Sequence, residues 1–129
     1  LQKGENFFFI KTGSQRIKKI FLNKILYIES LNEYIRIHLE GESHTIHHSL
    51  KSLLDVLPQD QFIQIHRSYI INFHKLDLVE GNTVKINNIE LNIGKNYRDD
   101  FLNLIKSNSI GLNLNQGKVN TQSIKKDNS

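Results

Sequence analysis

The stretch from Phe62 to Phe73, which reads FIQIHRSYIINF, constrains the fold more than any other part of the chain. If it were one strand, its odd positions would form a face that is apolar except for Arg67. Burying an unpaired guanidinium is costly, so the chain either turns at residues 66–68 or brings Arg67 to a buried anion. We expect the turn, because it would hold Arg67 and His66 at the surface, where they suit an anionic partner.

Length and composition indicate one domain without disulfides. A chain of 129 residues can bury a core, and the absence of cysteine excludes disulfides and thiolate metal sites. Apolar runs such as residues 7–10 are far shorter than the roughly 20 residues that cross a membrane, so we expect a soluble, cytoplasmic protein. The chain opens with Leu1 and contains no methionine. We therefore expect a piece of a longer protein, with residues 1–6 as a linker from an upstream domain.

The net charge of +4 permits nucleic-acid binding but is common among other proteins. The order of the predicted elements is more informative, and it indicates a mostly β domain. Alternation of apolar and polar residues between turn residues predicts strands over residues 7–12, 15–21, 26–29, 33–39, 43–48, 74–80, 83–86 and 89–93.

Two helices are expected. The first lies mid-chain, where Ser49 is a candidate N-cap before the apolar stripe Leu50, Leu53, Leu54 and Leu57, and Pro58 ends it. The second lies near the C-terminus, with Asn96 as the expected N-cap and Gly94 as the alternative. From residue 107 the chain is rich in Asn, Ser, Gln and Lys, so we expect residues 107–129 to be a disordered polar tail.

Five stretches, in this order, resemble the LytTR family of bacterial DNA-binding domains. They are FIKTGSQ at residues 9–15, ILYIESLNEYIRIHL at 25–39, LKSLLDVLP at 50–58, FIQIHRSYIIN at 62–72 and LNIGKNYRDDF at 91–101. The resemblance covers residues 7–106. It implies an elongated fold of short antiparallel β-sheets with one helix packed mid-chain and a C-terminal helix. It also implies that loops, rather than a recognition helix, contact promoter DNA, behind a phospho-receiver domain in a two-component response regulator.

The resemblance places the candidate DNA contacts in loops and at the start of the last helix. They are Asn32, Glu33, His66, Arg67, Lys95, Asn96 and Arg98. A serine and one or two arginines are common in the family where this chain has residues 94–96. That departure leaves the base preferred by this segment open.

Each candidate contact also has a structural explanation. Arg67 could pair with Glu29 or another carboxylate instead of a phosphate or guanine, and His66 could bond only to neighbouring backbone. Cations at a helix start oppose the helix dipole, so a bound anion explains Lys95 and Arg98 better than helix stability does. Four further cations could extend a phosphate track or form a solvated strand face; they are Lys11, Arg16, Lys18 and Lys19.

The histidines His44, His47 and His48 suggest a metal site, but their spacing on a strand puts His47 on the face opposite the other two. We expect no metal and no cofactor. Because no acid pair, Ser-His-Asp order or Gly-rich phosphate loop stands out, we do not expect an enzyme.

The sequence therefore predicts a sequence-specific, double-stranded DNA-binding output domain of a bacterial transcriptional regulator. The expected partners are promoter DNA, an upstream receiver domain, its cognate sensor kinase and a second copy on repeated sites, with no membrane. The alternative is a protein-interaction or dimerisation module of the same fold without specific DNA binding.

Overall fold

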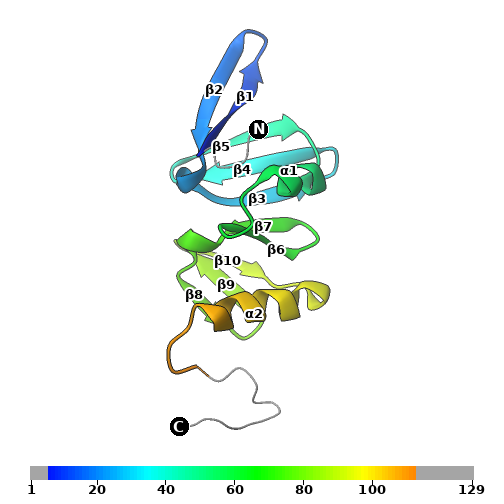
Figure 1. Cartoon of the computed structure of the whole chain (residues 1–129). Coiled ribbons are helices and arrows are strands. Elements are labelled where there is room, and N and C mark those ends of the chain that lie inside the picture. Colours follow the sequence, from blue (N-terminus) through cyan, green and yellow to red (C-terminus); the bar gives the residue numbers. More distant parts are fainter. Residues whose placement is uncertain (1–5, 113–129) are drawn as a thin grey trace. The chain divides into compact units, whose positions relative to one another are not determined.

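The computed structural model describes residues 6–112, which form mainly short antiparallel strands (Figure 1). The chain divides into two compact units, residues 1–97 and 98–129, and each is described by itself. In the first unit the strands are β1 (Phe7–Gly13), β2 (Arg16–Phe21), β3 (Ile25–Leu31), β4 (Tyr34–Leu39), β5 (Glu42–His47), β6 (Phe62–His66), β7 (Tyr69–Asn72), β8 (Leu78–Glu80), β9 (Thr83–Ile86) and β10 (Ile89–Asn92). The predicted mostly β fold, with antiparallel sheets and a C-terminal helix, is confirmed.

The strands form three sheets. The largest has the order β5-β4-β3-β7-β6, a second consists of β1 and β2, and a third has the order β10-β9-β8. Every pairing is antiparallel. Because β3 pairs with β7, the middle of the large sheet joins two hairpins that lie far apart in the sequence.

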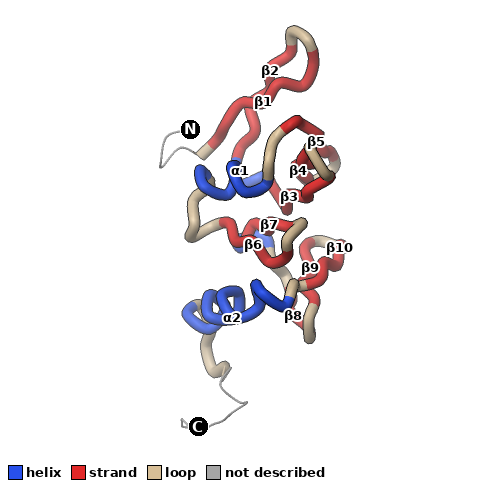
Figure 2. The backbone as a smooth tube through the Cα atoms, turned by 90° about the vertical axis from the view of Figure 1, so that its right-hand side faces the viewer, coloured by secondary structure: helices blue, strands red, loops and turns tan. Residues whose placement is uncertain are grey.

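Helix α1 (Leu50–Val56) covers one face of the large sheet and is capped as predicted. The Ser49 hydroxyl accepts a hydrogen bond from the backbone N–H of Ser52 at 3.0 Å, and Leu57 before Pro58 is the C-cap. Leu53 joins a buried cluster that includes Ile28 and Ile70 of the sheet. In Figures 1 and 2 the helix lies beside β3 and β7, so its apolar stripe is part of the core.

The stretch around Arg67 turns, as the sequence predicts. Strands β6 and β7 form a hairpin with Arg67 and Ser68 as the turn between them. The register shifts near Gln64, so the apolar face does not follow the odd positions. Ile70 and Ile71 are both fully buried, which means that β7 is covered on both faces.

Asn72 is the buried polar residue that ties the end of β7 to the start of β3. Its Nδ2 donates to the carbonyl oxygens of Leu22 at 3.3 Å and Ile25 at 2.8 Å. Its Oδ1 accepts from the N–H of His74 at 3.0 Å and opens a 3₁₀ helix over Phe73–Lys75. The predicted strand over residues 74–80 is therefore wrong in its first half, because this cap competes with extended backbone.

The C-terminal helix also begins differently from the prediction. A 3₁₀ turn over Lys95–Tyr97 precedes α2 (Arg98–Ser107), and the Tyr97 N–H donates to the Gly94 carbonyl at 3.0 Å. Asn96 thus lies inside helical backbone and is not the N-cap, whereas the alternative, Gly94, directly precedes the turn.

The second unit begins with helix α2, and Phe101 of this helix is fully buried. The Asn108 amide donates to the Leu104 carbonyl at 2.9 Å and so satisfies one of the last carbonyls of the helix. Residues 113–129 of the predicted tail lie outside the described residues. Neither described α-helix is long and apolar enough to span a membrane.

Candidate nucleic-acid interface

The β6–β7 turn is held in shape by its own side chains. His66 Nδ1 accepts from the N–H of Ser68 at 3.1 Å, and Gln64 Nε2 donates to the His66 carbonyl at 3.1 Å. The His66 ring also lies against Tyr69, with 5.1 Å between the ring centroids. His66 therefore bonds to neighbouring backbone, and its role in DNA binding stays a prediction. If Nδ1 accepts, the neutral ring carries its proton on Nε2.

Arg67 is exposed at the tip of this turn and forms no ion pair or hydrogen bond with any residue from 6 to 112. The alternative pairing with Glu29 does not occur, because Glu29 Oε1 lies 3.0 Å from His38 Nε2. The planar guanidinium is consequently available to an external acceptor, and its fork of donors matches a phosphate or a guanine edge.

The partner of Glu29, His38, belongs to a packed polar pair inside the large sheet. Its ring stacks on Tyr27 with 4.1 Å between centroids. Burial raises the pKa of the Tyr27 hydroxyl, and the charge of nearby Glu29 raises it further. Because these side chains interact with one another inside the sheet, they are not candidates for DNA binding.

Gly94 places the next segment directly beside the turn. Its N–H donates to the Ile65 carbonyl at 2.7 Å. A Cβ at this position would lie 3.4 Å from His66 Cα and 3.1 Å from Tyr97 Cδ2, which is closer than side chains usually approach. Glycine therefore permits the close approach, and it leaves Lys95 and Asn96 exposed next to the His66–Arg67 turn.

The β3–β4 turn lies at the same end of the large sheet. The N–H of Ser30 donates to the carbonyl of Ser68, which belongs to the Arg67 turn, at 2.9 Å. The turn at Asn32 and Glu33 begins two residues after Ser30 in the sequence. Asn32 has a positive φ of 61°, which an asparagine tolerates in a tight turn. Glu33 Oε1 lies 3.3 Å from His47 Nε2.

Two backbone hydrogen bonds, Ser30 to Ser68 and Gly94 to Ile65, therefore join three loop segments. We call residues 32–33, 66–68 and 94–96 together the loop end. It contains six of the seven candidate contacts. The seventh, Arg98, is half-buried at the first position of α2 and belongs to the second unit.

The cations of the β1–β2 hairpin have different surroundings. Lys18 Nζ lies 3.7 Å from Glu42 Oε2, and Lys19 Nζ lies 4.4 Å from the centre of the Phe7 ring. Partners within the protein thus occupy two of the four residues considered for a phosphate track.

The histidines do not assemble into a ligand set among the described residues, where no group of three metal-binding side chains occurs. His44 Nε2 lies 3.7 Å from Glu42 Oε2, which is too long for a hydrogen bond, and His47 faces Glu33 instead. Sequence reasoning considered His47 only as a metal ligand and missed its place beside the loop end. Counting outward from the Gly41 turn pairs Tyr34 with His47 and would have located it.

The fold and the loop end together define a class: a mostly β domain with a group of exposed cationic and amide side chains on loops. Residues 15–106 match the model of the LytTr DNA-binding domain. The chain therefore belongs to the LytTR family of DNA-binding domains.

Two relatives agree with this assignment. The structure of the LytTr DNA-binding domain of a putative methyl-accepting/DNA response regulator from Bacillus cereus superposes with a TM-score of 0.69. The match covers 79% of this chain and 98% of that one at 21% identity, and so shows a shared fold. An uncharacterized response regulatory protein from Vibrio cholerae is 35% identical over 69 residues, which are 50% of this chain and 26% of that protein.

Proposed function

We propose that this DNA-binding domain recognises a specific double-stranded sequence and serves as the output domain of a transcriptional regulator. The observation that carries the proposal is the loop end, where Arg67, Lys95 and Asn96 are exposed on segments that backbone hydrogen bonds join. Arg67 and Lys95 have no partner within the described residues, so a DNA contact by either of these two side chains would break no interaction that the fold uses.

The residue types suggest different tasks. The Arg67 fork can read guanine and the Asn96 amide can read adenine in the major groove, while Glu33 can accept from the amino group of cytosine. Asn32 shares the turn with Glu33 and is a further candidate contact. Lys95 and Arg98 are proposed as phosphate contacts, which position the domain without reading sequence. His66 shapes the Arg67 turn and is proposed to act through it.

Selection from a random duplex library tests the proposal directly. The 129-residue chain is expected to enrich one sequence motif, and its affinity for that duplex should fall steeply as salt is added. A matched duplex of shuffled sequence is the control. Recovery of no motif, or equal affinity for both duplexes, would contradict sequence-specific recognition and favour the protein-interaction module of the same fold.

The regulator that contains this domain is proposed to be a two-component response regulator, since one relative is described as a response regulatory protein and the other as a response regulator. The proposed partners are then a receiver domain, its sensor kinase, promoter DNA and a second copy on repeated sites. Incubating the full-length native protein with acetyl phosphate should add one phosphoryl group to an aspartate. A mass spectrum without that gain would contradict a receiver domain.

A further inference from the structure

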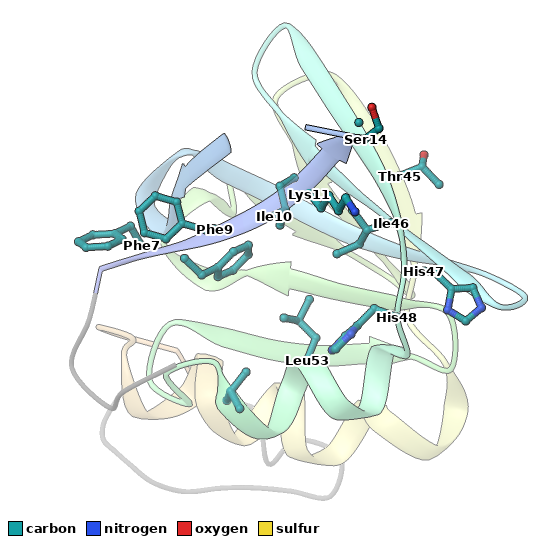
Figure 3. Close-up of a pocket in the computed structure, with 13 residues that line it drawn as sticks. Phe7, Phe9, Ile10, Lys11, Ser14, Thr45, Ile46, His47, His48 and Leu53 are labelled. Atoms are coloured by element: carbon teal, nitrogen blue, oxygen red, sulfur yellow. The ribbon is translucent and has the colours of Figure 1, made fainter. Parts of the chain in front are cut away.

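A large groove lies between the N-terminal hairpin, α1 and β5, and one of its lining residues, His47, contacts Glu33 of the loop end. Its volume is about 930 Å³, near the upper end of the roughly 300–1,000 Å³ that binding pockets occupy. Figure 3 shows Ile10, Ile46 and Leu53 in the middle of the groove, with Phe7 and Phe9 toward one end and His47 and His48 toward the other. Its floor is therefore continuous with the hydrophobic core.

The rim exposes apolar side chains that the fold does not need to expose. Phe9 is 58% exposed and Val56 is 44% exposed, and both line the groove. On the face of the hairpin that carries Phe9, Ile17 is 73% exposed and Phe21 is 43% exposed. Single exposed apolar residues are normal, but a cluster beside a groove marks a surface that binds something apolar.

The charged side chain in the lining of the groove is Lys11. His47 and His48 also line the groove, and no aspartate or glutamate does. The whole hairpin from residue 7 to residue 21 carries four Lys or Arg residues and no acidic residue. An occupant should therefore combine apolar groups with carboxylates.

The flanking strands offer backbone groups as well. Strand β1 pairs with β2 alone, and β5 is the edge of the large sheet. Each therefore has a second edge that pairs with no described strand, and such edges accept an extended peptide by main-chain hydrogen bonding.

Two other occupants fit less well. Residues 113–129 of this chain contain three lysines and one aspartate, so their charge has the same sign as that of the groove. DNA would leave the apolar rim unused, because phosphates gain nothing from Phe9 or Val56.

We propose that this groove binds an extended segment of a partner protein in which apolar residues alternate with aspartate or glutamate. The apolar side chains would enter the groove between Phe9 and Leu53, and a carboxylate would reach Lys11. This interaction surface shares none of the seven candidate DNA contacts and touches one of them, Glu33, through His47.

Peptide selection provides the test. A phage-displayed library of random octapeptides is panned against the 129-residue chain, and an enriched peptide labelled with fluorescein is measured by anisotropy. The enriched peptides are expected to combine apolar and acidic residues. Phe9→Thr and Lys11→Glu should each raise the Kd by about tenfold or more, since both remove a direct contact.

Matched controls remove similar groups elsewhere. Ile89→Thr removes an exposed apolar side chain from β10, and Lys75→Glu reverses an exposed charge; neither position lines the groove, and neither change should alter the Kd. The proposal is overturned if no peptide is enriched, if the enriched peptides lack acidic residues, or if they bind all variants equally. It is also overturned if Phe9→Thr weakens binding to the selected duplex as much as binding to the peptide, which would assign the surface to DNA.

Discussion

The first unit presents two cationic surfaces, and their surroundings differ. At the loop end, Arg67 and Lys95 stand among polar turns and have no partner within the described residues. On the β1–β2 hairpin, Lys19 lies over the Phe7 ring and Lys18 pairs with Glu42, beside exposed aromatic residues. Positive charge alone therefore does not mark a DNA-binding surface. The neighbours of the charge indicate whether the partner is a phosphate backbone or an acidic, apolar protein segment.

The largest expected effect comes from Leu53→Ala, because Leu53 is buried in the hydrophobic core and lines the groove. We expect the free energy of unfolding to fall by about 2–5 kcal/mol, measured by urea denaturation. The molecules that remain folded should bind the selected duplex with unchanged affinity, whereas binding to the groove peptide should weaken. A stable Leu53→Ala protein that cannot bind DNA would place α1 at the DNA interface and remove the contrast between the two surfaces.

Arg67→Ala and Asn96→Ala should each lower the discrimination between the selected duplex and a shuffled one by about 1–3 kcal/mol. Lys95→Ala should weaken binding to both duplexes and lower the slope of log affinity against log salt by about 1. Fluorescence anisotropy at several salt concentrations measures both quantities.

Lys75→Ala is the control for these variants, because Lys75 is exposed outside the loop end. If Arg67→Ala unfolds the domain while folded Asn96→Ala binds its duplex normally, the assignment of these two residues as base readers is wrong.

Gly94→Ala tests whether close packing fixes the loop end. The added Cβ would lie 3.1 Å from Tyr97 Cδ2, so we expect a loss of stability of about 1 kcal/mol from overpacking, with weaker specific DNA binding. Gly13→Ala in the hairpin is a matched control, because its Cβ would meet nothing closer than 3.7 Å. Thermal melts that show the same small change for both variants would mean that the Gly94 approach has no structural importance.

The smallest effect is expected from removing residues 113–129. Asn108, which bonds the end of α2, would be retained, so the melting temperature should stay nearly unchanged. The loss of Lys118, Lys125 and Lys126 should slightly weaken binding to shuffled DNA and leave sequence discrimination intact. A melting temperature many degrees lower would show that the removed segment packs on the domain.

Local sequence signals predicted the turn at Arg67 and the start of α1. An unpaired guanidinium cannot be buried cheaply, and Ser49 and Pro58 mark the ends of a helix. These inferences depend on neighbouring residues and a known chemical cost, so they need no knowledge of the tertiary structure.

The remaining features depend on residues that are distant in sequence. No local pattern indicates that Gly94 packs against His66, that Asn72 bonds to carbonyls near β3, or that Ile71 is buried on the face opposite Ile70. The wrong predictions for Asn96 and for residues 74–77 have the same origin. Both predictions used only the local propensity of polar residues. The helix cap that forms depends on where the tertiary structure places the chain.

The hydrogen bond between Gly94 and Ile65 also has a consequence for protein synthesis. Strands β1 to β5 leave the ribosome first, and each of their hairpins can form from adjacent residues. The loop end cannot exist until residue 94 has emerged, because that residue supplies the last of the bonds that join its three segments. The groove is complete earlier, because its lining residues all precede residue 57 and the strands on which α1 packs end at Asn72. A nascent chain of this domain therefore gains its proposed protein-binding surface before it can gain its DNA-binding one.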